Sequence, residues 1–330
     1  MIILKRVSIL LLLVSLMIGF SVSGIFAQVT HLTIGTASIS GTFYPLGVAA
    51  SQIFNDNVSG IKAVAIATAG SAQDTQMLDS KEIEIAVIDS QECFWAYNAI
   101  DPYKKKQTNL RGLTGGLYTE GMQVLAQKDK GIDTMWDIRG KSVAVGAPGS
   151  GGQSDAKDLL KAHDMTFDDV RPVYLDAEEA VDMLKDGRID VAILGLSEGS
   201  AAIAELMLSG KFKLLPVDEK GFQNYKSFYS DIIRFVIQAN VYPNQDYEVL
   251  SVALPPRIFA VLDDMSEELA YNLCKSIYEN MDALKAVSAV MDQFNLERVA
   301  TDVPLIPYHA GTLKYFKEMG ITPLEYKPIQ

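Results

Sequence analysis

"MLDSKEIEIAVID" (77–89) and "MLKDGRIDVAILG" (183–195) are two copies of one pattern in a chain of 330 residues. Each copy has Met-Leu, a polar turn, an isoleucine, an acid, a β-branched residue, an alanine and two more apolar residues. Met-Leu is typical of a helix end, and the apolar run that follows the turn is typical of a buried strand. The repeated design predicts two sheets of similar construction.

A second matching segment lies upstream of each copy. "HLTIGTASISGTFYPLG" (31–47) and "KSVAVGAPGSGGQSDAKDLL" (141–160) each predict a strand, a loop rich in glycine and hydroxyl groups, and a helix. Strands that alternate with helices favour parallel sheets covered by helices. Coincidence is the alternative, since α/β sequences resemble one another, but the shared Met-Leu and Ile-acid steps favour a real repeat in a two-lobed α/β fold.

Helices are expected to follow the glycine-rich loops. The pairs Ser71/Asp74 and Ser150/Gln153 have the spacing of capping boxes at helix starts. Residues 45–54 begin with a proline, which suits a first helical turn, and they place apolar side chains at helical spacing. The side chains of that apolar face are Leu46, Ala49, Ala50, Ile53 and Phe54. A second amphipathic helix is predicted over "SEELAYNLCKSIYENMDALKAV" (266–287).

The stretch "GAPGSGGQSDAKDLL" (146–160) looks like a phosphate-binding loop but lacks the matching motifs. No Gly-Lys-Ser/Thr follows, and the dinucleotide pattern is not met in register. The stretch can be a turn that only starts a helix, or an anion site, because a glycine loop before a helix offers free N–H groups. Three such loops, 36–44, 67–74 and 147–153, favour a carboxylate ligand held without arginine, since none of them contains one.

The first residues have the layout of a secretory signal peptide. Lys5 and Arg6 precede an unbroken apolar run (7–20), and small residues lead to a plausible cleavage site after Ala27. An uncleaved membrane anchor is the alternative. Removal of residues 1–27 leaves 27 basic against 41 acidic residues, a net charge of −14. We therefore expect a periplasmic protein that binds neither nucleic acid nor anionic membrane surfaces.

The cysteines and histidines do not form a reactive or metal-binding pattern. Cys93 and Cys274 lie in helix-like segments and are interpreted as buried small hydrophobic side chains, with their pairing left open. His31, His163 and His309 have no second ligand at metal-binding spacing. We therefore expect no metal site and no Cys–His nucleophile pair.

An enzyme on the same scaffold is the competing class of function, because a fold does not determine chemistry. Glu92 and Glu198 follow the last strand of each repeat and are the candidates for acid–base work in a cleft. The simpler interpretation is that they are exposed acids that open helices. We expect no catalytic residues and no cofactor.

The chain resembles the TAXI-type extracytoplasmic solute receptors of tripartite ATP-independent periplasmic (TRAP) transporters over essentially its whole mature length. The resemblance rests on the order and spacing of "GTASISGTFYPLG", "ATAGSAQD", "SVAVGAPGSGG", "LKDGRIDVAIL", "VYPNQDYEVLSVAL" and "YHAGTLKYFKEMG". It implies a two-lobed, periplasmic-binding-protein-like fold of type II that closes around its ligand. It also implies delivery of the ligand to a sodium-driven membrane partner. Ligands of the family are small carboxylates, glutamate and related compounds.

The same resemblance divides the chain. Lobe one would be 28–127 with 251–330, and lobe two 128–250, with crossings near "VLAQKD" and "SVALPP". The implied partners are a small carboxylate or amino acid and the TRAP membrane subunits, and the receptor is expected to be a monomer. A receptor that feeds a sensor kinase is the alternative.

Donors to the ligand are expected from the three glycine-rich loops and, more weakly, from two further residues. The candidate ligand-binding residues are Ser38, Thr42, Tyr44, Thr68, Ser71, Gln91, Tyr118, Gly149, Ser150, Gly151 and Gln153.

Overall fold

Apart from Thr30, the helices and strands described below belong to one compact unit, which begins at His31. The predicted signal peptide, residues 1–27, lies outside the described residues. Among the residues that are described, no helix is both long enough and apolar enough to cross a membrane. The computed structural model describes residues 29–39, 41–228, 232–253, 255–302 and 304–327.

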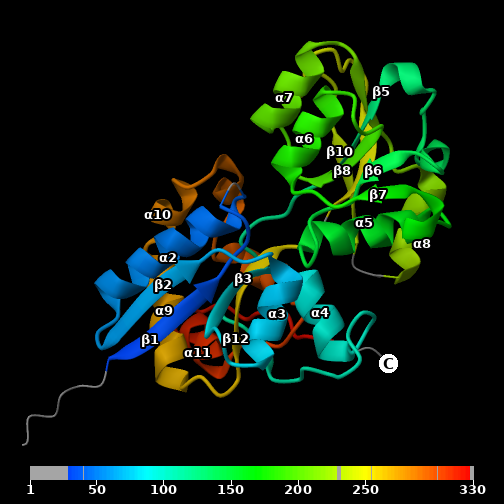
Figure 1. The fold of residues 1–330 in the computed structure, drawn as a ribbon. Helices are drawn as coiled ribbons and strands as arrows, with labels where there is room; N and C mark the ends of the chain where they lie inside the picture. The colour runs from blue at the N-terminus through cyan, green and yellow to red at the C-terminus, as the bar shows by residue number, and fades with distance from the viewer. Residues whose placement is uncertain (1–28, 40, 229–231, 254, 303, 328–330) are drawn as a thin grey trace, which may run out of the picture. The chain divides into compact units, whose positions relative to one another are not determined.

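Two five-stranded sheets carry the fold, and their strand orders correspond one to one (Figure 1). The first sheet runs β2 (Ile61–Ile66), β1 (Thr30–Gly35), β3 (Ile85–Asp89), β12 (Arg257–Leu262), β4 (Leu110–Gly112). The second runs β7 (Arg171–Val173), β6 (Ser142–Ala144), β8 (Val191–Gly195), β5 (Met122–Gln127), β9 (Phe212–Leu215). The third strand in each order has a parallel neighbour on one side and an antiparallel neighbour on the other.

Helices cover both sheets, as the alternating sequence pattern predicts (Figure 1). Those around the first sheet are α2 (Phe43–Asn57), α3 (Ser71–Asp79), α4 (Ser90–Asn98), α9 (Glu267–Glu279), α10 (Met281–Lys285) and α11 (Ala310–Glu318). Those around the second are α5 (Gly151–Ala162), α6 (Ala177–Lys185), α7 (Ala201–Leu208) and α8 (Glu219–Phe228). Short 3-10 turns are η1 (Lys128–Lys130), η2 (Met135–Ile138), η3 (Phe167–Asp169), η4 (Ala289–Gln293) and η5 (Glu297–Ala300).

The hydrogen bonds of the acids confirm the predicted repeat. Glu84 Oε2 accepts a hydrogen bond from Thr33 N at 2.7 Å, and Asp190 Oδ2 accepts one from Ser142 N at 3.0 Å. In both copies the backbone N–H of the acid donates to the carbonyl of that same partner, at 3.2 and 2.9 Å. The acid in the Ile-acid step therefore ties its strand to the neighbouring parallel strand in each sheet.

The polar turn of each copy is closed by the same backbone hydrogen bond. Glu82 N donates to Met77 O at 2.8 Å, and Arg188 N donates to Met183 O at 2.9 Å. The residue before each donor is left-handed, with φ of +60° in the first copy and +74° at Gly187. The region favours glycine, so only the second copy has the residue type that this turn prefers.

The predicted apolar faces form the cores beside the first sheet. Leu46 and Phe54 on α2 are fully buried. The prediction of one helix over 266–287 is wrong, because α9 ends at Glu279 and α10 begins at Met281. The apolar stripe nevertheless continues through the break: Leu273, Ile277 and Leu284 are fully buried.

Two crossing segments join the sheets. Leu117 N donates to Arg257 O at 2.7 Å, and Arg257 N donates to Tyr118 O at 2.9 Å, so the segments run side by side. An isolated antiparallel bridge links Gly121 to Ala253, where the ribbon of β10 (Ile233–Ile237) and β11 (Val249–Ala253) ends. Pairing places β5 in the second sheet, so the first crossing comes before Met122 rather than near "VLAQKD". The division into lobes stays a prediction.

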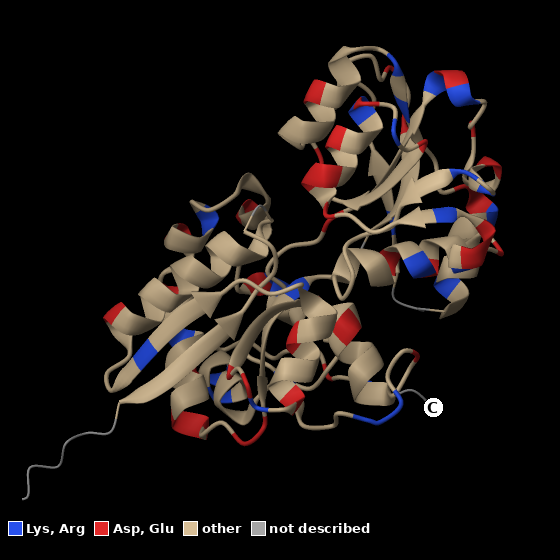
Figure 2. Ribbon diagram, viewed as in Figure 1, with Lys and Arg blue, Asp and Glu red and all other residues tan. Residues whose placement is uncertain are grey.

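The charge of the chain is spread widely. Figure 2 shows Asp and Glu interspersed with Lys and Arg on the helices around both sheets. Exposed ion pairs such as Lys185–Glu205, at 2.6 Å, contribute little to stability, because water screens the two charges. Arg257 is different, because its ion pairs are buried.

Candidate functional site

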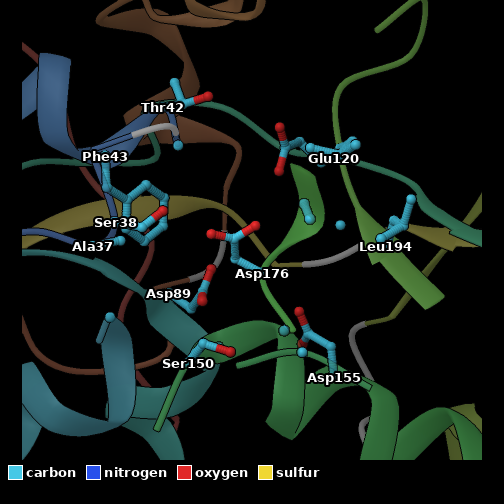
Figure 3. Close-up of a pocket in the computed structure, with 18 of the residues that line it drawn as sticks. Ala37, Ser38, Thr42, Phe43, Asp89, Glu120, Ser150, Asp155, Asp176 and Leu194 are labelled. Atoms are coloured by element: carbon cyan, nitrogen blue, oxygen red, sulfur yellow. The ribbon is translucent and has the colours of Figure 1, made fainter. Parts of the chain in front are cut away.

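One cavity of about 400 Å³ is lined by loops that follow strands of both sheets. Figure 3 shows lining side chains that come from the segment after β1, the end of β3, α5 and its cap residue, the cap residue of α6, and β8. Such a place, at the carboxyl ends of parallel strands, is where α/β folds bind ligands. The polar lining residues are Ser38, Thr42, Ser71, Asp89, Tyr118, Glu120, Ser150, Asp155, Asp176, Ser197, Ser200, Arg257 and Ser288.

The three predicted glycine-rich loops meet at this cavity. The lining includes Ala37 to Thr42 from the first loop, Ala69 to Ser71 from the second, and Ala147 to Gly152 from the third, each in part. The predicted candidates that line it are Ser38, Thr42, Ser71, Tyr118, Ser150 and Gly151. The candidates outside the lining are Tyr44, Thr68, Gln91, Gly149 and Gln153.

Several of the candidates outside the lining shape the loops instead. Gln153 Oε1 accepts a hydrogen bond from Gly149 N at 3.0 Å, four residues earlier. Gln73 makes the same contact in the other loop, where its Oε1 accepts from Ala69 N at 2.6 Å. Thr68 Oγ1 accepts from Gly70 N at 3.1 Å. These side chains hold the backbone of the loops in place from behind the cavity.

Ser150 caps helix α5, as one of the sequence interpretations expected. Its hydroxyl accepts a hydrogen bond from Gln153 N at 3.2 Å and donates to Ala147 O at 2.7 Å. Both bonds lie within the loop, so the hydroxyl proton is already used. The predicted reciprocal bond from Gln153 differs, because its side chain accepts from Gly149 N rather than from the cap residue.

The predicted capping box at Ser71 and Asp74 is wrong. Ser71 is the first residue of α3, its cap position is Gly70, and no side chain caps the helix. The Ser71 hydroxyl instead donates to Asp89 Oδ2 at 2.8 Å and accepts from Asp89 N at 3.1 Å. Asp74 is fully buried with neither carboxylate oxygen hydrogen-bonded, and burial raises its pKa to about 8. Through its two hydrogen bonds to Asp89, Ser71 holds that acid in place at the end of β3.

The start of α5 touches the first sheet's loops closely. A Cβ built on Gly151 would lie 1.8 Å from Asp89 Oδ2, so no side chain fits there without movement. Gln73 N also donates to Gly149 O at 3.4 Å. A glycine at 151 thus permits the close approach of α5 to the acid at the end of β3.

The sequence interpretation missed a buried ion network at the cavity. Arg257 Nε lies 2.8 Å from Asp89 Oδ1, and Arg257 Nη2 lies 3.4 Å from Glu120 Oε2. Glu120 Oε1 accepts from Ser197 Oγ at 2.8 Å, and Arg257 Nη1 donates to Pro255 O at 2.9 Å. Burial raises the pKa of Glu120, and the Arg257 charge offsets part of that effect. The network links the end of β3, both crossing segments and the loop after β8.

Two further acids of the lining were missed. Asp155 lies on α5, one turn after Gly151, and is 7% exposed. Asp176 is the cap residue of α6, where its Oδ1 accepts from Glu179 N at 2.9 Å. A strand-end rule would have found Asp89, the last residue of β3. Asp155 has no such signal, because it sits within a helix whose register to the cavity the sequence does not give.

Glu92 is a buried acid, which corrects the expectation of an exposed one. It lies in the first turn of α4, is 1% exposed, and its Oε1 accepts from Tyr103 Oη at 2.5 Å. Burial raises the pKa of Glu92 to about 7, against the hydrogen bond from Tyr103. Glu198 is exposed, as expected. Neither residue belongs to the cavity lining.

The cysteines are free and buried, in agreement with their interpretation as small core side chains. Cys93 lies in α4 and Cys274 in α9, and burial raises the pKa of both thiols. Over the described residues, no group of three His, Cys, Asp or Glu side chains is arranged to hold a metal ion.

Comparison with protein families gives a match over most of the chain, at residues 34–320. The chain belongs to the NMT1-like family. The matched range contains both sheets almost entirely, together with the cavity, so family membership and the described fold concern the same part of the molecule.

The solved structures to which this NMT1-like protein is similar share little sequence with it. A protein from Bordetella bronchiseptica RB50 has a TM-score of 0.53 and 14% identity, covering 88% of this chain and 98% of that one. For the periplasmic aliphatic sulphonate binding protein SsuA from Escherichia coli, the TM-score is 0.45 and the sequence identity is 15%. The match covers 91% of this chain and 87% of that one. For a putative L-cystine ABC transporter from Listeria monocytogenes, the TM-score is 0.46 and the sequence identity is 13%. The match covers 79% of this chain and 94% of that one. The predicted two-lobed α/β class is confirmed.

Proposed function

We propose that this NMT1-like protein is an extracytoplasmic solute-binding receptor rather than an enzyme. It captures a small carboxylate or amino acid, glutamate-like or related, and delivers it to a sodium-driven TRAP membrane transporter. The observation that carries the proposal is the cavity to which loops of both sheets contribute. A volume of about 400 Å³ is in the range of small-molecule sites.

The chemistry of the lining supports binding of a polar solute. Hydroxyl groups of Ser38, Thr42 and Ser200 and the first turn of α5 border the cavity. Hydroxyl groups donate and accept hydrogen bonds, and the N–H groups of a helix start attract a carboxylate. The eleven candidate residues of the sequence interpretation stay proposed as a set. Those in the lining border the solute, Ser150 as the cap of α5 rather than through its hydroxyl. Thr68, Gly149 and Gln153 support the loops.

Closure around the solute is the proposed mechanism. The two crossing segments, residues 113–121 and the described residues 253 and 255–257, are short and lie side by side, which is the arrangement of a hinge. A solute that contacts loops of both sheets shifts the population toward the closed form. Small-angle scattering should therefore give a smaller radius of gyration with solute than without it. An unchanged profile at saturation contradicts closure.

Export is proposed with cleavage after Ala27. The mass of the protein isolated from the periplasm should then correspond to a chain that begins at Gln28. A full-length mass, with the protein in the membrane fraction, would indicate the anchored alternative.

Recovery of the natural solute tests the receptor role. The purified protein is denatured, and the released small molecules are identified by mass spectrometry. The recovered solute is then returned to refolded protein and should bind with a stoichiometry near one and stay chemically unchanged. Steady formation of a new product would favour the enzyme alternative.

A further inference from the structure

The charges of the cavity lining do not balance. The lining contains four carboxylates and one guanidinium among the described residues: Asp89, Glu120, Asp155, Asp176 and Arg257. Asp89 and Glu120 are the ion-pair partners of Arg257. Asp155 and Asp176 have no cation within ion-pair distance in the described part of the chain.

Asp155 is the acid without a partner. Its residue is 7% exposed, and over the residues that the structure describes no hydrogen bond or ion pair reaches its carboxylate. Figure 3 shows that carboxylate directed into the cavity, on the same side of it as Ser150. Withdrawing a carboxylate from water without a partner is costly. A side chain of this kind at a cavity wall indicates that its partner is supplied by the bound solute.

We propose that the solute carries a protonated amine, which the Asp155 carboxylate binds. The proposal rests on the proposed receptor function and narrows it from any small carboxylate to an amino acid or related amine. Asp176, a cap residue with one oxygen engaged, also lines the cavity and adds negative potential to it. A plain dicarboxylate would instead bring negative charge to a lining that already has an excess of it.

The arrangement of α5 fits an α-amino acid. Gly151 begins the helix and Asp155 follows four residues later, so both lie on one face, about 6 Å apart along the axis. The first-turn N–H groups suit a carboxylate and Asp155 suits an ammonium group. The volume of about 400 Å³ is also far larger than an inorganic cation requires.

The titration of Asp155 gives the proposal a second readout. Burial and the charge of Asp89 raise its pKa, and Arg257 lowers it. An ammonium group beside the carboxylate lowers that pKa further, so binding of an amine releases a proton from Asp155. If protonated Asp155 donated a hydrogen bond to a solute carboxylate, binding would retain or take up a proton. The charged and titratable groups that face it are Asp89, Glu92, Glu120, Asp158, Asp176 and Arg257.

The test compares amino acids with the acids that lack only the amino group. The purified, ligand-free protein is titrated by calorimetry with the twenty common amino acids and their deaminated analogues, glutamate and glutarate being one pair. We expect at least one amino acid to bind roughly ten- to a hundredfold more tightly than its analogue, because a hydrogen bond to a charged group is lost. Equal or tighter binding of the analogue overturns the proposal and leaves the receptor function intact. If no solute binds and none is recovered from the protein, the receptor function fails, and this inference fails with it.

Asp155→Asn identifies the residue responsible. The substitution should weaken binding of the amino acid by roughly tenfold or more. Binding of the deaminated analogue should be unchanged or tighter. Asp158→Asn, on the same helix and also buried but outside the lining, is the matched control and should leave the difference between the pair intact. Thermal melts establish that both variants fold. In buffers of different ionisation enthalpy, wild type should release a proton and Asp155→Asn should not. Equal loss for both ligands of the pair, or proton uptake by wild type, overturns the assignment.

Discussion

Arg257 Nε and Asp89 Oδ1 lie 2.8 Å apart, with both side chains less than a tenth exposed. Arg257 starts β12 and Asp89 ends β3, so the pair joins the return of the chain from the second sheet to the centre of the first. Glu120 and Ser197 extend the contact to the other crossing segment and to the loop after β8. Because the network is buried and joins the end of β3, both crossing segments and the loop after β8, it holds these parts of the cavity wall together.

Arg257→Met should destabilise the protein by about 3–5 kcal/mol, because Asp89 and Glu120 would keep buried charges without a cation. Urea unfolding measures the loss. Arg188→Met removes an exposed pair with Asp186, at 3.6 Å, and should cost less than about 1 kcal/mol. Similar losses for both variants would mean that the buried network does not hold the crossing in place.

Gly151→Ala should reduce solute affinity at least tenfold, because its Cβ would lie 1.8 Å from Asp89 Oδ2 and push α5 away from β3. Gly152→Ala is the matched control, since its Cβ would meet Ser150 Oγ at an ordinary 3.7 Å. Both changes add an alanine in the first turn of α5, so the difference between them isolates the close approach. Calorimetric titration of both variants measures it, and equal affinities would contradict the prediction.

Ser150→Ala should lower stability by about 1 kcal/mol and change affinity less than threefold. Its hydroxyl donates to Ala147 O and accepts from Gln153 N, which leaves no proton for the solute. Ser266→Ala removes the equivalent cap of α9, far along the chain from the cavity loops, and should lose a similar amount. Thermal melts and titrations of both variants are the measurements. A large loss of affinity for Ser150→Ala alone would show that the hydroxyl contacts the solute.

Asp74→Asn should become more stabilising, relative to wild type, as pH rises from about 5 to 7. Burial raises the pKa of Asp74 to about 8, above its unfolded value of 3.8. Between these values the folded state keeps a proton that the unfolded state has lost, so this acid costs stability as pH rises. The difference between variant and wild type should change by up to about 1.4 kcal/mol per pH unit. Denaturant unfolding at several pH values measures it, and a constant difference would be the contrary result.

The repeat made most of the fold predictable. The Met-Leu turn and the acid after the isoleucine recur because each copy needs the same closure, seen at Glu84 and Asp190. Period and spacing also predicted the buried faces of α2 and α9, because helical geometry is local. The break at Asn280 was not predictable in this way, since the apolar stripe continues across it.

The candidate site was predictable only where it follows strands. The three glycine-rich loops could be placed because the carboxyl ends of parallel strands meet at one edge. Arg257 and Glu120 come from crossing segments whose pairing depends on long-range contacts, so the sequence alone did not bring them to the loops. Because these long-range contacts cannot be read from the sequence, we expected a carboxylate site without arginine. The lining instead contains one arginine and four acids.

A crystal structure of the protein with its recovered solute is the most direct test of the account. We predict one solute molecule in the cavity, in contact with the loops that follow β1, β2 and β6, with an amine nitrogen about 3 Å from an Asp155 carboxylate oxygen. A solute bound outside this cavity, or one found there chemically altered, would contradict it.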